Sequence, residues 1–187
     1  MKKLIAIVLT LVLVMAMFAG CGKEKAPATE ANVPGSALEI LENIWGLYGE
    51  DEKFPVMGGD FNNMVDGAPG AYDVSDAEAL AYQLLVPVEQ AGNVTEAAAL
   101  FHGMMVNNFT CGVFRVGAEA ENFAKAIYES VQGNQWMCGF PDSVLVSVIG
   151  GEYVLMAFGI NDAMDPFEAK AQEAYPEAVI VYNEAIA

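Results

Sequence analysis

The sequence predicts a domain of the α+β class, in which an antiparallel sheet packs helices on one of its faces. Residues 110–117 (TCGVFRVG) are β-branched and aromatic, which favours a strand. Residues 118–133 repeat large apolar side chains every four positions, at Phe123, Ile127 and Val131, which favours a helix. Two later apolar runs are separated by a Gly-Gly pair, which indicates two strands joined by a tight turn.

The elements of residues 110–182 follow the order strand, helix, strand, strand, helix, strand. This order matches the ferredoxin-like βαββαβ arrangement. After the first strand and helix, the sequence predicts strands at 143–149 and 152–159, a helix at 165–175 and a short strand at 178–186.

The segment before residue 92 reads as two helices separated by a long loop. Residues 36–39 (SALE) form a capping box that begins a helix, which we expect to end near Gly49. Residues 50–72 are dense in Gly, Asp, Asn and Pro, and predict an irregular or short-stranded segment. A second capping box at residues 75–78 begins another helix, which ends before Pro87.

Residues 98–106 leave two topologies open. The alanines at residues 97–99 favour a helix, whereas Gly103 and the apolar residues after it fit a buried strand. If this segment is a strand, it pairs with residues 110–117 across a hairpin, and the topology is no longer ferredoxin-like.

The first twenty residues have the pattern of an export signal. Two lysines precede the apolar run of residues 4–19, which is short for a membrane span of roughly 20 residues. Residues 18–21 (FAGC) resemble a bacterial lipobox, in which the cysteine thiol is acylated and the peptide before it is removed. We therefore expect residues 1–20 to be a lipoprotein signal peptide and Cys21 to carry lipid, a palmitate-type acyl anchor.

The rest of the chain divides into a tether and a folded part. Residues 21–35 are rich in Ala, Pro, Glu and Gly without an apolar period, so we expect a disordered tether. Residues 36–187 have the length of a single domain. The expected location is the cell membrane, lipid-anchored and facing the extracytoplasmic side.

The composition excludes some partners. The chain has 25 Asp and Glu against 8 Lys and Arg, a formal charge of −17. Removal of the two lysines with the signal peptide makes the chain more acidic still. Nucleic acid and anionic lipid surfaces attract Lys and Arg, so neither is expected to bind. The expected partners are the membrane, through the lipid, and an envelope protein.

The C-terminal half resembles a known family. Met104-Met105-Val106-Asn107 before a strand, and Gly151-Glu152-Tyr153-Val154 at a turn and strand, are similar to motifs of small exported clostridial-type lipoproteins, a domain of unknown function. The resemblance covers residues 76–175 and departs from the pattern at the loop of residues 136–140. It implies a location and a fold, and no catalytic residue.

The candidate site residues lie around that loop. Trp136, Met137 and Phe140 could dock a partner, or the loop could fold back over the end of the sheet. Cys111 and Cys138 could form a disulfide, remain free as small apolar side chains, or include a nucleophile.

The leading functional hypothesis is a non-enzymatic binding or adapter domain on a lipid anchor. No cofactor fingerprint or metal-ligand spacing is present in the sequence, so no cofactor or metal is expected; an apparent calcium loop at residues 60–67 has its glycine in the wrong register. The first alternative is a thiol-dependent enzyme or redox protein that uses Cys138 or Cys111, with His102 as the only histidine. The second is a lipoprotein that binds a small molecule or a cation.

Overall fold

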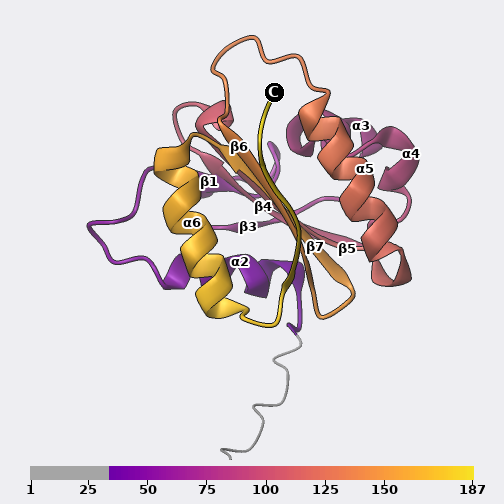
Figure 1. Cartoon of the computed structure of the whole chain (residues 1–187), viewed down its shortest axis with the longest axis horizontal. Coiled ribbons are helices and arrows are strands. Elements are labelled where there is room, and N and C mark those ends of the chain that lie inside the picture. The colour runs from indigo at the N-terminus through magenta and orange to yellow at the C-terminus, as the bar shows by residue number, and fades with distance from the viewer. Residues whose placement is uncertain (1–33) are drawn as a thin grey trace, which may run out of the picture. The chain divides into compact units, whose positions relative to one another are not determined.

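The structure is a computed structural model that describes residues 34–187 (Figure 1). The predicted signal peptide, the predicted lipidation site Cys21 and most of the predicted tether lie outside these residues. One antiparallel sheet has the order β2-β1-β4-β5-β7-β6-β8, and β3 also pairs with β4. The strands are β1 (Val56–Gly58), β2 (Val65–Asp66), β3 (Gly70–Tyr72), β4 (Glu96–His102), β5 (Phe109–Arg115), β6 (Ser143–Ile149), β7 (Tyr153–Gly159) and β8 (Val179–Ala185).

Helices cover both faces of the sheet, and the prediction that they share one face is wrong. The α+β class itself is confirmed. Alternate residues of β4 belong to opposite cores: Leu100 packs in one and Phe101 in the other. The first core contains α2 (Ala37–Gly46) and α6 (Asn161–Ala174), and the second contains α3 (Ala77–Leu84), α4 (Val88–Ala91) and α5 (Ala120–Gln132).

Helices cover both faces because part of residues 98–106, the segment that left two topologies open, is a strand. Residues 96–102 form β4, which pairs with β5 and occupies the edge that the last strand of a ferredoxin-like sheet would take. β8 therefore pairs with β6, at the far edge. Both helical crossovers then run in the same direction across the sheet, from strands that are antiparallel to each other. Because such crossovers are right-handed, α5 and α6 must lie on opposite faces.

Local signals in the sequence account for most element ends. Ser36 Oγ accepts a hydrogen bond from the Glu39 N–H at 3.0 Å, and the Glu39 carboxylate accepts from the Gly35 N–H at 2.9 Å. At α3, Asp76 rather than the predicted Ser75 is the cap, because its carboxylate accepts from the first N–H groups of the helix. Gly150 and Gly151 have φ of 60° and 74°, which the tight turn between β6 and β7 requires.

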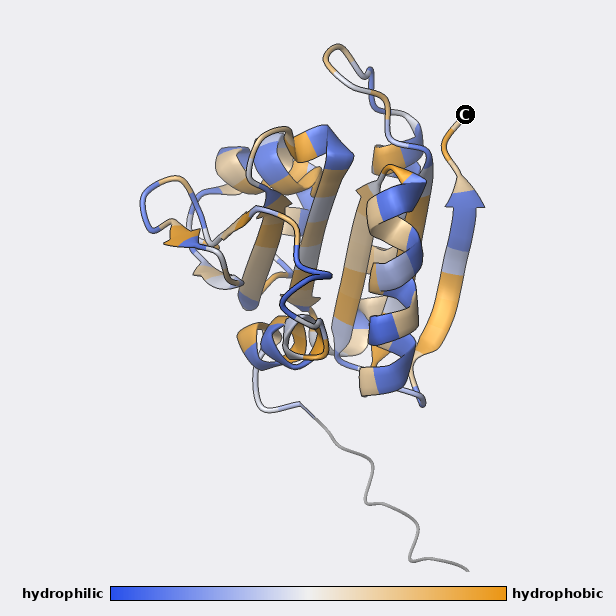
Figure 2. Ribbon diagram, turned by 90° about the vertical axis from the view of Figure 1, so that its left-hand side faces the viewer, coloured by the Kyte–Doolittle hydropathy of each residue, from blue (hydrophilic) through white to orange (hydrophobic). Residues whose placement is uncertain are grey.

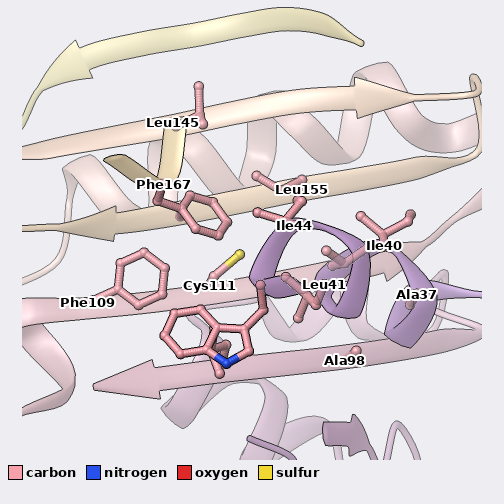
Figure 3. Packing of buried hydrophobic residues seen from close by; sticks show 14 of the residues in the cluster. Ala37, Ile40, Leu41, Ile44, Ala98, Phe109, Cys111, Leu145, Leu155 and Phe167 are labelled. Carbon is pink, nitrogen blue, oxygen red and sulfur yellow. The ribbon is translucent and has the colours of Figure 1, made fainter. Parts of the chain in front are cut away.

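The first core lies between the sheet and the helices α2 and α6 (Figure 3). Phe109 on β5 meets Phe167 on α6 edge to face, with ring centroids 5.0 Å apart. In the second core, Phe123 on α5 packs against Phe114 on β5 with ring centroids 5.3 Å apart, and both are fully buried. None of the helices in residues 34–187 is both long enough and apolar enough to cross a bilayer.

The two ends of the sheet carry different parts of the domain. At one end the folded region begins: the Ala37 N–H donates to Glu96, the first residue of β4. At the other end lies the loop between α5 and β6, where the Asp142 N–H donates to the carbonyl of Gly159, the last residue of β7. Figures 1 and 2 show this loop and the start of α2 at opposite ends of the molecule.

Candidate functional site

A groove of about 570 Å³ opens at the end of the sheet that carries the α5–β6 loop. Its floor is a single row of side chains, each the cross-strand partner of the next. The row consists of Met57 on β1, Phe101 on β4, Thr110 on β5 and Phe158 on β7. All four point to the α3 and α5 face, because residues opposite each other in a sheet share a face. Neighbouring strands are about 4.8 Å apart, so the row is roughly 14 Å wide.

The groove has three walls. The last turn of α3 forms one wall, and the loop between β1 and β2 forms the second. The loop after α5 and the residues that connect β4 to β5 together form the third. Apart from the floor, the groove is lined by Gly58, Gly59, Phe61, Met64, Ala81, Tyr82, Gln83, Leu85, Val106, Asn107, Asn134, Gln135, Trp136, Met137 and Cys138. Several of these apolar side chains are largely exposed, among them Tyr82 at 81% and Met137 at 85%.

Asp60 holds the β1–β2 loop in place. Its side chain is only 5% exposed and accepts hydrogen bonds from the backbone N–H groups of Asn62 at 2.7 Å, Asn63 at 3.1 Å and Asp73 at 3.2 Å. Burial alone would raise the pKa of Asp60, but these hydrogen bonds and the Asn63 amide together lower it. The carboxylate therefore stays charged, and the predicted irregular segment is an ordered wall.

Asn107 holds the loop after α5. Its side-chain amide donates to the backbone carbonyls of Cys138 at 2.8 Å and Gly139 at 3.2 Å. Gly139 has φ of 92°, and a Cβ there would come within 2.9 Å of the Met105 Sδ. The loop thus depends on glycine and is tied to the segment that connects β4 and β5.

The loop predicted to dock a partner combines both alternatives of that prediction. Trp136 folds back on the sheet and packs against Phe158, with ring centroids 5.0 Å apart. Met137 and Phe140 point away and stay exposed, Phe140 at 72%. Of these three residues, Trp136 and Met137 line the groove and Phe140 does not.

The groove differs in charge from the rest of the domain. No charged side chain is among the described residues that line it. Within residues 34–187, each basic side chain forms an ion pair with a glutamate: Lys53 with Glu50, Arg115 with Glu152, Lys125 with Glu129 and Lys170 with Glu52. The surface around the groove is consequently acidic, and the groove is a neutral interruption of it.

Two polar atoms in the walls have no hydrogen-bond partner within the described part of the chain. They are the Trp136 Nε1, a donor, and the Gln83 Oε1, an acceptor, and both are buried. An unpaired buried polar atom costs about 1–3 kcal/mol, so both gain from any motion that brings a partner to them.

The structure does not bring the two cysteines together. Cys111 is fully buried in the α2 and α6 core (Figure 3). Cys138 is exposed in the groove on the other face of the sheet, and both are free thiols. Burial raises the pKa of the Cys111 thiol well above its usual value, which disfavours the reactive thiolate. His102 stacks on Phe54 at a centroid distance of 5.6 Å, and its Nδ1 accepts from the N–H groups of Met104 and Met105. It is not part of the groove lining.

Sequence reasoning identified one wall of this site and missed the others. The floor depends on strand registers, which no local pattern encodes. The β1–β2 loop resembles a calcium loop in the wrong register, and its Asp-x-Asn-Asn pattern is also a signal for an aspartate that caps its own turn. No family model, curated protein or solved structure matches this sequence, so the resemblance to exported lipoproteins stays a prediction.

Proposed function

We propose that this chain is a lipid-anchored extracytoplasmic binding protein, whose groove receives apolar side chains or an apolar portion of a ligand. The observation that carries the proposal is the uncharged groove with exposed Met, Phe and Tyr side chains. Soluble domains rarely leave apolar groups together on their surface without a use for them. A volume of about 570 Å³ is within the range of sites that bind ligands.

The side chains that line the groove are suited to ligands of more than one shape. Methionine is flexible and polarisable, so Met57, Met64 and Met137 can adjust to ligands of different shape. The floor is fixed by strand pairing, and two of the three walls are fixed by Asp60 and Asn107. This combination of a rigid base with adaptable contacts favours an adapter or receptor role.

The position of the groove supports the proposed anchoring. The folded region begins at the end of the sheet opposite the groove. A chain anchored at Cys21 would have a tether of up to roughly 50 Å, at about 3.3–3.6 Å per extended residue. The segment that joins the domain to the lipid would then enter the domain at the end opposite the groove.

The binding proposal is tested with an uncharged apolar dye, Nile red, and a fragment of residues 32–187, which form one compact unit. Met64→Ser combined with Tyr82→Ser removes two exposed apolar groups from the groove. Loss of about 1 kcal/mol of apolar contact should weaken binding about fivefold to tenfold. The matched control is Val179→Ser with Ile180→Ser, which removes exposed apolar groups from β8. Equal weakening by both pairs, or no saturable binding, would overturn the proposal.

The anchoring proposal is tested in cells with the full chain and labelled palmitate. Wild type should incorporate the label and appear in the membrane fraction. Cys21→Ala should lose the label and accumulate as an unprocessed precursor, whereas Cys138→Ala should behave as wild type. Labelling that survives Cys21→Ala would show that the lipid, if any, is attached elsewhere.

A further inference from the structure

We infer that the ligand of the groove is a cationic amphipathic segment of a polypeptide, whose apolar side chains enter the groove while its Lys and Arg side chains meet the acidic surface around it. This inference rests on the proposed binding function and specifies the ligand. It follows from the distribution of charge, the width of the floor and the two unpaired polar atoms.

Carboxylates flank the neutral groove on two sides, at α3 and at the β1–β2 segment. Glu78 is exposed one helical turn before Tyr82, so the two side chains share a face of α3. Asp66 is exposed on β2 opposite Met57. Asp60 carries its charge between two lining residues of the β1–β2 loop.

Among residues 34–187, no basic side chain lines the groove to offset these carboxylates. The four basic side chains in residues 34–187 are all held in ion pairs. An anionic ligand would be repelled, and a neutral one would gain nothing from the field, whereas a cationic one is attracted at long range. Charge complementarity therefore selects a ligand with basic groups beside its apolar ones.

The dimensions and side chains of the groove fit one helix. A floor of roughly 14 Å exceeds the diameter of an α-helix with its side chains, about 10–12 Å. Methionine-rich grooves with acidic surroundings suit the apolar face of a basic amphipathic helix, because flexible Met side chains adapt to different apolar residues. Met57, Met64 and Met137 belong to three different segments around the groove.

The unpaired polar atoms favour a polypeptide over a lipid. Trp136 Nε1 is a donor and Gln83 Oε1 is an acceptor. A peptide or side-chain amide offers the complementary acceptor and donor. An acyl chain offers neither and would leave both atoms unpaired.

The experiment measures binding of synthetic fluorescent peptides to the 32–187 fragment. The probe is a Leu/Lys peptide patterned as an amphipathic helix. Its controls are the same composition scrambled to destroy the apolar face, and Leu/Gln and Leu/Glu peptides of the first pattern. We expect the Leu/Lys peptide to bind about tenfold or more tightly than each control. Its affinity should fall as salt rises from about 50 mM to about 500 mM, because salt screens the attraction.

Variants locate the peptide on the protein. Met64→Ser with Tyr82→Ser should weaken the Leu/Lys peptide about tenfold, and Val179→Ser with Ile180→Ser should not change its affinity. Glu78→Gln with Asp66→Asn should reduce the dependence on salt while leaving Nile red binding intact. Both acidic positions are exposed, so circular dichroism should confirm an unchanged fold.

The outcomes separate this inference from the function on which it rests. Equal binding of the scrambled or Leu/Gln peptide would overturn the inference, because apolar pattern or charge would then play no part. Saturable Nile red binding without peptide binding would also overturn it, while the proposed function stands. Loss of both would reject the two together.

Discussion

Replacement of Asp60 should loosen the wall of the groove by an amount that the structure allows us to estimate. The carboxylate accepts from three backbone N–H groups. A hydrogen bond to a charged group contributes about 1.5–3 kcal/mol, but these donors belong to exposed residues that water can reach. We therefore expect Asp60→Ala to lower the free energy of unfolding by about 3 kcal/mol. Asp60→Asn keeps one acceptor oxygen, for Asn62 and Asn63, and should cost about 1.5 kcal/mol.

The pH dependence of this loss tests its cause. Because the folded-state pKa of Asp60 is lowered, its contribution is present above the unfolded value of about 3.9 and is lost as pH falls through the folded pKa. Urea unfolding of the 32–187 fragment should show a constant gap between wild type and Asp60→Asn from about pH 7 to about pH 5. The gap should narrow below about pH 4.

A matched control and two outcomes make the Asp60 experiment decisive. Asp51 is exposed and accepts no hydrogen bond within the described region, so Asp51→Asn should leave the unfolding free energy nearly unchanged. Equal stability of Asp60→Ala and Asp60→Asn would refute the hydrogen-bond account. A gap that persists undiminished at low pH would refute the account of the charge.

Three further predictions concern the cores and the thiols. Tyr48→Phe should raise the free energy of unfolding at neutral pH by up to about 1 kcal/mol, because the Tyr48 hydroxyl is buried with no partner in residues 34–187. Burial, with repulsion from Cys111 and Glu52, raises the Tyr48 pKa. The free energy of unfolding of the wild type should therefore fall as pH rises above about 10. The urea midpoint of the variant should fall less over the same pH range. Phe123→Ala should cost about 4 kcal/mol in urea unfolding, and a loss below about 1 kcal/mol would contradict the second core. A thiol reagent should label Cys138 rapidly in the folded 32–187 fragment and Cys111 only after unfolding. Slow labelling of both cysteines in the folded fragment would contradict the exposure of Cys138. Absence of labelling after unfolding would contradict the assignment of both cysteines as free thiols.

The sequence was sufficient for elements whose signals are local. The cap at Ser36, the helix with Phe123 and Ile127, and the turn at Gly150 depend on neighbouring residues, and each is found in the structure. Alternation and β-branching likewise identified most of the long strands.

The pairing of strands that are far apart in the sequence determines the sheet topology, which local sequence signals do not predict. Ala98 packs under α2 in the first core, and Ala97 and Ala99 face the second core, although a run of alanines is typical of a helix. Once β4 pairs with β5, the place of β8 and the face of α6 follow from the handedness of crossovers.

Only part of the groove can be predicted from the sequence, because long-range strand pairing brings the rest of its lining residues together. Trp136 and Met137 are predicted as docking residues because aromatic and apolar side chains are unusual in a loop. Tyr82 and Met64 looked ordinary, since only the tertiary fold places the end of α3 and the β1–β2 loop around the same row of strand residues.

The outer edge of β8 has a consequence for self-association. β8 contains neither Lys nor Pro, and its first residues are apolar and exposed, Val179 at 63% (Figure 2). An edge of this kind can pair with the same strand of another molecule. The register shift opposite Val146 and Ser147 leaves Val181 without a partner and interrupts the row of free N–H and C=O groups. Such a bulge disfavours edge-to-edge pairing of β8 between copies of the domain.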